Sequence, residues 1–250
     1  MELSVENTAV QLTNVSFQYE TNNPTFLNNI SLSIAKNDRF GIFGPNGAGK
    51  TTLMSMMTGI LKPKSGSISL FGNSLFDNDA KRLFGYVPQD FAFYPELTPK
   101  ENLQFYGAWY GLNKQQIKER SEELLTILGL YDVRNKQLKK FSGGMKRRIN
   151  LAIGIMHRPQ IIFLDEPTVG VDIQSRHAIV TYLKELNANG STLIYTSHHL
   201  KEAEDLCQNV VLIDEGVIIA HDNMQDLIDK HEENGLEGLF LKLTGNAYRD

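Results

Sequence analysis

The 250-residue chain has an ordinary globular composition, with 41% hydrophobic and 22% charged residues, which excludes a disordered or fibrous protein. A formal net charge of −4 gives no overall attraction for nucleic acid or anionic lipid. The single cysteine, Cys207, excludes an internal disulfide and a cysteine-cluster metal site. No apolar stretch reaches the roughly 18 residues that a membrane-spanning helix needs, and residues 1–6 lack the basic-then-apolar pattern of a signal peptide. We therefore expect an intracellular protein that reaches a membrane only through a partner.

Residues 1–89 predict an α/β core with an antiparallel β edge at the N-terminus. Short apolar or alternating segments, which are typical of strands, occupy residues 15–19, 30–34, 40–43, 68–70 and 84–87. The first two alternate apolar with polar side chains, as half-buried antiparallel strands do. The helix after the third strand is expected to end at Gly59, because glycine commonly follows the last helical residue.

Residues of about 90–158 predict a helical lobe inserted into the sheet. Residues 98–101 form a capping box with proline at the first helical position, which starts one helix. A second helix is expected over residues 113–128, and a third begins after Ser142 with a regular apolar stripe. The lack of strand candidates between these helices indicates a separate lobe.

The alternation of strands and helices returns over residues 159–231, which predicts a mainly parallel sheet. The expected elements are a strand at 161–164, a helix at 174–189, a strand at 192–196, a hairpin of 210–213 with 217–220, and a helix at 224–231. We therefore expect one domain with its core at residues 1–89 and 159–231 and a short C-terminal extension at 232–250.

A glycine-rich loop matches the phosphate-binding pattern G-x-x-x-x-G-K-[ST]. It consists of Gly44, Pro45, Asn46, Gly47, Ala48, Gly49, Lys50 and Thr51, with Thr52 directly after it. A strand leads into the loop and a helix leaves it, so backbone N–H groups and the positive end of the helix can surround a phosphate. In this interpretation Lys50 reaches the β and γ phosphates, and the Thr51 hydroxyl helps to hold Mg²⁺.

Two other segments contain groups that suit the same chemistry. The apolar strand at residues 161–164 ends abruptly in Asp165 and Glu166. Beside a phosphate loop, Asp165 would hold Mg²⁺ through its water shell, and Glu166 would orient or deprotonate the attacking water. Residues 142–144, Ser-Gly-Gly, open the third lobe helix and are either an ordinary serine cap or a second anion-binding helix start.

In their order along the chain, these segments resemble the nucleotide-binding subunit of ATP-binding cassette (ABC) transporters. The motifs are the phosphate loop, Gln89, Ser142-Gly143-Gly144, Asp165-Glu166, Asp172 and His198, and they span essentially the whole chain. The resemblance implies the P-loop NTPase fold of ABC ATPases, with ATP and Mg²⁺ as cofactors.

The resemblance also implies a role for each of the remaining residues. Gln89 would reach the Mg²⁺ and the catalytic water and link the site to a membrane partner. His198 would contact the γ-phosphate, whereas His199 has no such counterpart in the family. Tyr19 would stack on adenine, and Asp172 would lie across a dimer interface.

Two copies of the family's cassettes pack head to tail, so Ser142, Gly143 and Gly144 of one chain would cap the ATP held by the other. Met145 departs from the family, which usually has glutamine there, and Val171 before Asp172 is also less typical. Methionine cannot provide the amide hydrogen bonds, although the backbone N–H groups and the Ser142 hydroxyl remain. The run Ser-Gly-Gly-Met-Lys-Arg-Arg looks like the version in bacterial drug and lipid exporters.

Two further clusters concern partners. The basic pair at residues 139–140 and the basic triplet at residues 146–148 could suggest nucleic acid, but we expect a solvated helix face or a positive rim that attracts ATP. Seven aromatic residues follow Gln89 closely: Phe91, Phe93, Tyr94, Phe105, Tyr106, Trp109 and Tyr110. Some must belong to the lobe core, and two or three are expected to line the groove that receives a short helix of the membrane subunit.

The sequence thus predicts an ATPase subunit, peripheral on the cytoplasmic face of a membrane, that powers a separate permease. Residues 236–245 resemble the ending of ABC-2-type exporter cassettes, which favours export. One alternative is a soluble ABC ATPase that acts on ribosomes or nucleic acid, although no nucleic-acid partner is expected. The other is a catalytically weak regulatory cassette, against which Lys50, Asp165, Glu166 and His198 argue, while Met145 keeps it open.

Overall fold

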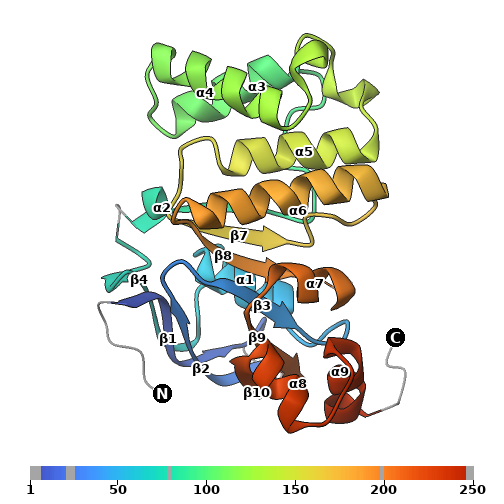
Figure 1. The fold of residues 1–250 in the computed structure, drawn as a ribbon. Helices are drawn as coiled ribbons and strands as arrows, with labels where there is room; N and C mark the ends of the chain where they lie inside the picture. The colour runs from blue at the N-terminus through green and yellow to red at the C-terminus, as the bar shows by residue number, and fades with distance from the viewer. Residues whose placement is uncertain (1–6, 21–25, 78–79, 198–199, 246–250) are drawn as a thin grey trace.

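The computed structural model describes residues 7–20, 26–77, 80–197 and 200–245. Its strands are β1 (Thr8–Phe17), β2 (Leu27–Ala35), β3 (Arg39–Phe43), β4 (Ser65–Leu70), β5 (Asn73–Ser74), β6 (Phe84–Val87), β7 (Ile161–Asp165), β8 (Thr192–Thr196), β9 (Asn209–Asp214) and β10 (Val217–Asn223). The helices are α1 (Lys50–Met57), α2 (Ala80–Leu83), α3 (Pro99–Trp109), α4 (Lys114–Ile127), α5 (Gly143–Gly154), α6 (Ile173–Ala188), α7 (Leu200–Leu206), α8 (Met224–Lys230) and α9 (Leu236–Thr244), with short 3₁₀ turns η2 (Tyr131–Val133) and η3 (Leu138–Lys140). Figure 1 shows α3, α4 and α5 stacked beyond one edge of the strands.

The larger sheet has six strands in the order β10-β9-β3-β8-β7-β6. Only β10 runs antiparallel to its neighbour, and the other pairings are parallel, so the predicted mainly parallel sheet is confirmed. The apolar strands β7 and β8 are buried along their whole length, as parallel strands covered on both faces must be.

The antiparallel strands near the N-terminus form a sheet of their own, in the order β2-β1-β4-β5. We expected them as an edge of the main sheet. The difference arises because β1 is paired on both sides, with β2 and with β4, and β3 is likewise paired on both sides, with β8 and with β9. β1 also ends at Phe17, so Tyr19 lies just beyond the strand in which we expected it.

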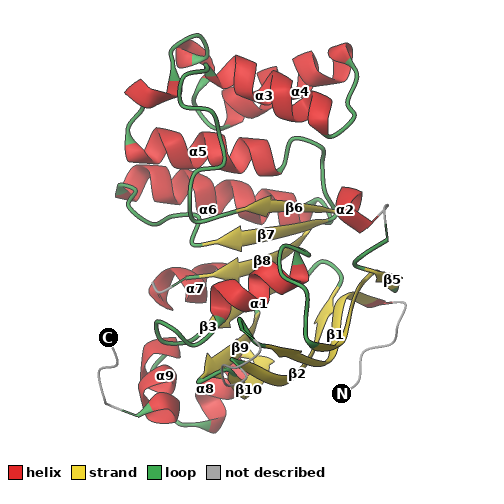
Figure 2. Cartoon of the chain, turned by 180° about the vertical axis from the view of Figure 1, so that it is seen from behind, coloured by secondary structure: helices red, strands yellow, loops and turns green. Residues whose placement is uncertain are grey.

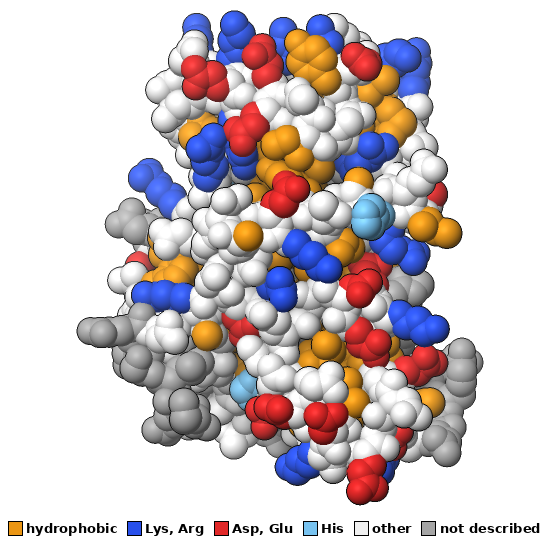
Figure 3. All heavy atoms as spheres, viewed as in Figure 1, with side chains coloured by type: hydrophobic (Ala, Val, Ile, Leu, Met, Phe, Trp, Pro, Cys, Tyr) orange, Lys and Arg blue, Asp and Glu red, His pale blue; other side chains and the backbone are white. Residues whose placement is uncertain are grey.

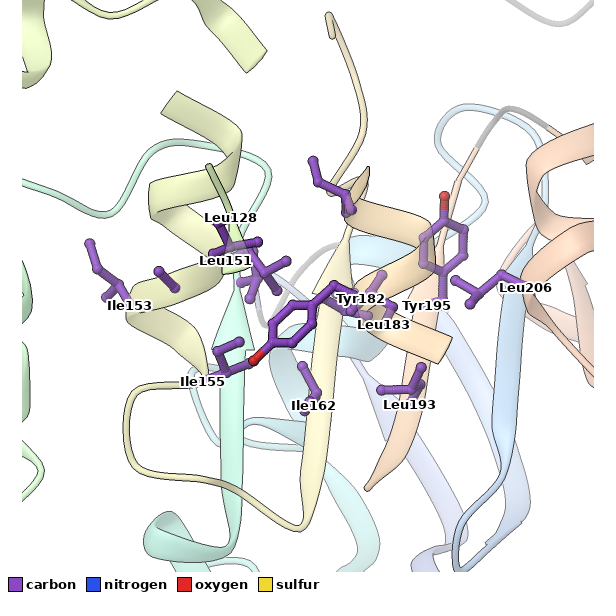
Figure 4. Packing of buried hydrophobic residues seen from close by; sticks show 14 of the residues in the cluster. Leu128, Leu151, Ile153, Ile155, Ile162, Tyr182, Leu183, Leu193, Tyr195 and Leu206 are labelled. Atoms are coloured by element: carbon purple, nitrogen blue, oxygen red, sulfur yellow. The ribbon is translucent and has the colours of Figure 1, made fainter. Parts of the chain in front are cut away.

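The alternation of side chains across the main sheet produces two hydrophobic cores. On β7, Ile161 and Phe163 pack on the side of α1 and the antiparallel sheet, where Figure 2 shows α1 in front of the strands. Ile162 and Leu164 belong to the other core, together with residues of α5, α6 and α7. Figure 4 shows part of this second core, in which Ile162 lies near Tyr182 of α6 and Ile155 at the end of α5.

The chain leaves the main sheet at the end of β6 and returns at β7, which pairs with β6. The three predicted helices lie in this interval. Thr98 and Asn113 each complete a capping box at the start of α3 and α4, and Gly129 follows the end of α4 with a positive φ of 64°. The division of the chain into core, lobe and C-terminal extension stays a prediction.

Two short helices, α2 and α7, were not predicted, because neither has enough residues for a helical period to be recognised. Helix α9 contacts α7, and Glu204 Oε1 accepts a hydrogen bond from the Leu236 backbone N–H at 2.5 Å, where α9 begins. Among the helices in the described part of the chain, none combines the length and apolarity that crossing a bilayer requires.

Candidate functional site

The glycine-rich loop and the carboxylate pair predicted from the sequence lie together at the carboxyl ends of three neighbouring parallel strands of the main sheet. β3 leads into Gly44, β7 ends at Asp165, and β8 ends at Thr196. In the register of the sheet, Thr196 is the partner of Ile42 on one side and of Asp165 on the other. The sheet therefore brings the glycine-rich loop and the carboxylate pair together although about 115 residues separate them in the sequence.

The glycine-rich loop leaves the start of α1 open to a ligand. Gly47 and Gly49 have φ values of 79° and 107°, in the region that favours glycine. Gly49 is the N-cap of α1 and provides no side-chain hydrogen bond. Because no capping side chain occupies the first N–H groups of the helix, they are available to an anion. A β-carbon on Gly44 would lie 2.2 Å from the Ile213 carbonyl oxygen, so only glycine fits where the loop passes β9.

Lys50 lies folded over the glycine-rich loop. Its Nζ donates hydrogen bonds to the carbonyl oxygens of Gly44 at 2.9 Å and Pro45 at 3.0 Å, and the residue is only 8% exposed. Burial lowers the pKa of Lys50, while the nearby carboxylates of Glu166 and Asp165 raise it. The ammonium group thus lies at the loop and close to the carboxylates, where it can bind a phosphate oxygen.

Asp165 is buried beside the first turn of α1. The Thr196 hydroxyl donates a hydrogen bond to Asp165 Oδ1 at 2.6 Å, and the Thr51 hydroxyl also hydrogen-bonds to this carboxylate. Burial raises the pKa of Asp165, whereas these hydrogen bonds and Lys50 lower it. A hydroxyl and a carboxylate at the mouth of a phosphate loop are the hard oxygen ligands that Mg²⁺ prefers, so the residues fit this ion.

Glu166 is held in an unusual backbone conformation next to Gln89. Its φ of 50° lies in the left-handed region, and its N–H is 3.2 Å from both the carbonyl and the hydroxyl oxygen of Thr196. The Gln89 Nε2 donates to Glu166 Oε2 at 3.2 Å. A strained residue that tertiary contacts hold in place is common at functional sites. The structure therefore brings Gln89 and Glu166 together.

Tyr19 stands at the other side of the glycine-rich loop. Its hydroxyl oxygen lies 2.6 Å from Oγ1 of Thr52, in the first turn of α1. The ring makes T-shaped contacts with Phe17 and Phe26 and remains 58% exposed. An exposed aromatic ring beside a phosphate loop can stack on a planar base.

The signature segment, Ser142–Gly144, and Asp172 form a second group, at the starts of α5 and α6. Ser142 Oγ accepts a hydrogen bond from the Met145 N–H at 3.3 Å, and Asp172 caps α6 by accepting from the Ser175 N–H at 2.8 Å. A β-carbon on Gly144 would lie 2.6 Å from Ser175 Oγ, so the two helix starts are close neighbours. Hydrogen bonds from Ser175 lower the pKa of Asp172. The predicted His198, with His199, lies outside the described residues.

Three residues near the site were missed or misread from the sequence. Thr196, which contacts both carboxylate residues, could have been noticed as a polar end of an apolar strand. Asn150 is 1% exposed and hydrogen-bonds to the loop around Gln89. The expected solvated basic face is wrong for Arg147, which is 7% exposed, because its guanidinium group finds backbone carbonyl partners inside the protein. The positive rim is also partly neutralised, since Lys139 forms an ion pair with Glu96.

A strand, a glycine-rich loop with lysine and threonine, and a buried aspartate on a neighbouring parallel strand define a P-loop nucleotide-binding protein. The chain matches the family described as ABC transporter over residues 27–169, which is more than half of its length. The chain therefore belongs to the ABC transporter family and is an ATP-binding, ATP-hydrolysing cassette.

Relatives and solved structures agree with this assignment. The chain is 44% identical to the linearmycin resistance ATP-binding protein LnrL of Bacillus subtilis over 82% of its own length and 67% of that protein. It is 38% identical to the Nod factor export ATP-binding protein I of Cupriavidus pinatubonensis over 81% of its length, which spans 63% of that relative. A solved ATP-binding subunit of an ABC transporter matches 95% of the chain and 100% of its own chain with 27% identity and a TM-score of 0.87. The protein cbiO1 from Clostridium perfringens, part of the complex cbiONQ, matches 91% of this chain and 93% of its own with 26% identity and a TM-score of 0.80.

Proposed function

We propose that this cassette hydrolyses ATP to energise a separate membrane permease in an export system. One observation carries the catalytic part: Lys50, Thr51 and Asp165 adjoin one another at the mouth of the glycine-rich loop, with Glu166 beside them. The direction rests on the relatives, since one is named for linearmycin resistance and another for Nod factor export. An exporter cassette is the function that accounts for both.

Each residue of the site then has a defined task. The backbone N–H groups of residues 44–52 and the Lys50 ammonium group bind the phosphates. Thr51, Asp165 and Gln89 would hold Mg²⁺, which when bound would supply positive charge to neutralise the phosphate oxygens. Glu166 orients the attacking water and accepts its proton, while Gln89 fixes the Glu166 carboxylate by the hydrogen bond at 3.2 Å. Tyr19 stacks on the base, and contact with the γ-phosphate is the role that we propose for His198.

The signature segment acts on the nucleotide of a second copy. It begins α5 in an exposed position, with Ser142 and Gly143 open to solvent, whereas α1 and its loop belong to another layer of the fold (Figure 1). A head-to-tail dimer would use the N–H groups of Ser142, Gly143 and Gly144, together with Asp172, to close two ATP sites between the chains. Closure would then depend on ATP, and reopening on its hydrolysis.

An exposed aromatic patch provides the surface for the permease on the cytoplasmic face of the membrane. Its members are Trp109, Tyr94, Phe105 and Phe91, which are 78%, 47%, 41% and 40% exposed. Tyr94 and Trp109 both contact the Phe105 ring, while Phe93, Tyr106 and Tyr110 pack against the core. Tyr94, Phe105 and Trp109 thus form a contiguous exposed aromatic surface, which is typical of protein interfaces. Phe91 is a further exposed ring, three residues before Tyr94 in the sequence.

The two alternative functions have less support. On the face seen in Figure 3, Lys and Arg side chains are interspersed with Asp and Glu side chains rather than gathered in one basic stripe, which disfavours an ATPase that acts on nucleic acid. The hydrogen-bonded arrangement around Asp165 and Glu166 disfavours a catalytically weak regulatory cassette. A steep salt dependence of RNA or DNA binding would revive the first alternative.

The Glu166→Gln variant tests the catalytic assignment. We expect it to bind ATP, to accumulate as an ATP-dependent dimer, and to lose turnover by about 10²–10⁴-fold, because the amide cannot accept the proton of water. Light scattering and phosphate release measure the two effects on purified protein. Glu96→Gln, which removes an exposed carboxylate of an ion pair on the lobe, is the matched control. A Glu166→Gln protein that stays monomeric and turns over like the wild type would contradict the proposal.

The Trp109→Glu variant tests the docking surface. We expect the chain to lose its attachment to the membrane fraction of the cells that normally make it, because a charge would have to be buried in the interface. Sedimentation of membranes with bound chain measures this, and thermal unfolding checks the fold. Ile127→Glu is the control, since Ile127 is also an exposed apolar residue of the lobe, at 45%, but lies on α4 outside the patch. Equal membrane attachment of both variants would remove the patch from the proposal.

A further inference from the structure

Two side chains of α5, those of Arg147 and Asn150, hydrogen-bond to the loop that carries Gln89. Arg147 Nη1 donates a hydrogen bond to the Gln89 carbonyl oxygen. Three residues further along, Asn150 Nδ2 donates to the Pro88 carbonyl oxygen at 3.0 Å, and Asn150 Oδ1 accepts from the Ala92 N–H at 3.0 Å. Residues three apart share one face of a helix, so Arg147 and Asn150 act as one polar clamp on this loop.

The Arg147 guanidinium group also reaches the segment behind the catalytic carboxylates. Its Nε donates to the Val169 carbonyl oxygen at 3.2 Å. Val169 lies midway between Glu166 and Asp172 in the sequence. A single side chain of α5 therefore joins the Gln89 loop, the segment after Glu166, and the helix that the signature segment begins.

Both side chains of the clamp are buried, so breaking their hydrogen bonds to the surrounding segments is unfavourable. Arg147 is 7% exposed and Asn150 is 1% exposed. Burial lowers the pKa of Arg147, but the carboxylates of Glu166, Asp90 and Asp165 favour its charged form, and an arginine stays protonated in proteins. If the three segments moved apart, a buried charge would lose its acceptors, which is strongly unfavourable. The segments are consequently expected to move together.

The outer side of the guanidinium group faces the aromatic patch. Its central carbon lies 4.8 Å from the centroid of the Phe91 ring, which stacks in turn on Phe93 with centroids 5.2 Å apart. Arg147 is thus in contact with the proposed docking surface on one side and with the site loops on the other.

We propose that Arg147, assisted by Asn150, is a positioning residue that couples the aromatic patch to the nucleotide-facing loops. A partner helix seated on the patch displaces Phe91 and the Gln89 loop, and the clamp transmits this displacement to α5 and its signature segment. The same linkage works in reverse when ATP draws the signature segment onto a second copy. This inference rests on the proposed ATP-driven dimer.

The adjacent arginine provides a matched comparison. Arg148 donates to the carbonyl oxygens of Leu128 at 2.9 Å and Gly144 at 3.4 Å, both of which belong to the helical segment itself. Removal of its guanidinium group perturbs the same helix without cutting the connection to the Gln89 loop. Arg147→Met removes the contacts with Gln89 and Val169, whereas Arg148→Met removes contacts within the helical segment only.

The experiment follows the Gln89 loop while ATP closes the dimer. The parent is Glu166→Gln with Ala92→Cys, labelled with an environment-sensitive fluorophore; Ala92 is exposed, and the natural Cys207 is buried and does not compete for the label. We expect ATP with Mg²⁺ to change the fluorescence over the same concentration range in which light scattering detects dimers. Added to this parent, Arg147→Met should still allow dimers to form, but the fluorescence change on ATP addition should be about tenfold smaller. Arg148→Met should leave the fluorescence change as large as in the parent. Arg147→Lys should be intermediate, because an ammonium group lacks the fork that reaches two carbonyls.

A full fluorescence amplitude in Arg147→Met would overturn the inference. If that variant does not fold, Asn150→Ala takes its place, since it removes the other half of the clamp and keeps the buried guanidinium group; a full amplitude there is equally contradictory. A parent that binds ATP without forming dimers would overturn the proposed function itself, and the inference with it. That outcome is recognised before any clamp variant is measured.

Discussion

The starts of α1 and α5 are both glycine-rich, and they differ in what satisfies their backbone N–H groups. At α1 no side chain caps the helix, and the preceding loop is held by its passage against β9 and by Lys50. At α5, Ser142 caps the Met145 N–H with its own hydroxyl, and the helix start packs on Asp172 and Ser175. The first arrangement leaves its backbone donors uncapped, so we expect it to bind an anion within one chain. The second has part of its donors already used and is expected to act only when a second chain supplies the nucleotide.

The largest effect should come from adding one methyl group first to the loop that leads into α1 and then to the start of α5. In Gly44→Ala the new β-carbon would lie 2.2 Å from a backbone oxygen that cannot move alone, so we expect a loss of about 3 kcal/mol in unfolding free energy and of ATP binding by the monomer. In Gly144→Ala the nearest atom, at 2.6 Å, is the side-chain oxygen of Ser175. This variant should keep ATP binding by the monomer and weaken the dimer.

Chemical denaturation and nucleotide binding measure the two glycine variants. Gly143→Ala is the control, because its β-carbon would approach no described atom closer than 3.1 Å, and its stability should change by less than about 1 kcal/mol. Equal loss of monomer ATP binding in Gly44→Ala and Gly144→Ala would erase the distinction between the two helix starts.

A smaller effect is expected on the pH dependence of ATP hydrolysis, through the pKa of Asp165. The hydrogen bond from Thr196 lowers the pKa of Asp165, so Thr196→Val should raise that pKa further above its usual range. More of the carboxyl group is then protonated at a given pH, and the acidic limb of kcat/KM against pH should move to higher pH. Thr192→Val, the same change at the other end of β8, should leave the limb in place. An unshifted limb in Thr196→Val would exclude Asp165 as the group that titrates.

The smallest effect is expected at the start of α5. Met145 is half-buried and packs against the core formed with residues of α5, α6 and α7. Met145→Gln should therefore lower the unfolding free energy by about 1 kcal/mol. It should change ATP turnover of the dimer by less than about twofold, because the backbone N–H groups already provide the anion site. Phosphate release at saturating ATP measures this. A tenfold gain in turnover would instead show that the usual glutamine is required and that this chain is a weakened cassette.

The sequence correctly predicted those elements that depend only on residues close together in the chain. The glycine-rich loop, the apolar strand before Asp165 and the capping box at Thr98 each depend on neighbouring residues, and the structure has the corresponding elements where they were expected. The burial of Arg147 depends on the carbonyl groups of Gln89 and Val169, which are far away in the sequence, so a run of three basic residues looked solvated. Thr196 likewise gains its role only because β8 lies between β3 and β7.

The position of β8 has a consequence for synthesis of the chain. Both neighbours of β3 in the sheet, β8 and β9, follow the entire helical segment in the sequence. The glycine-rich loop therefore leaves the ribosome long before either strand exists to hold it, and its contacts are among the most distant in the chain. Loop closure over such a separation is slow, so the nascent chain gains an ATP site only when most of it has been made. A fragment that ends before β8 contains the glycine-rich loop but neither of the two strands that flank β3 in the sheet.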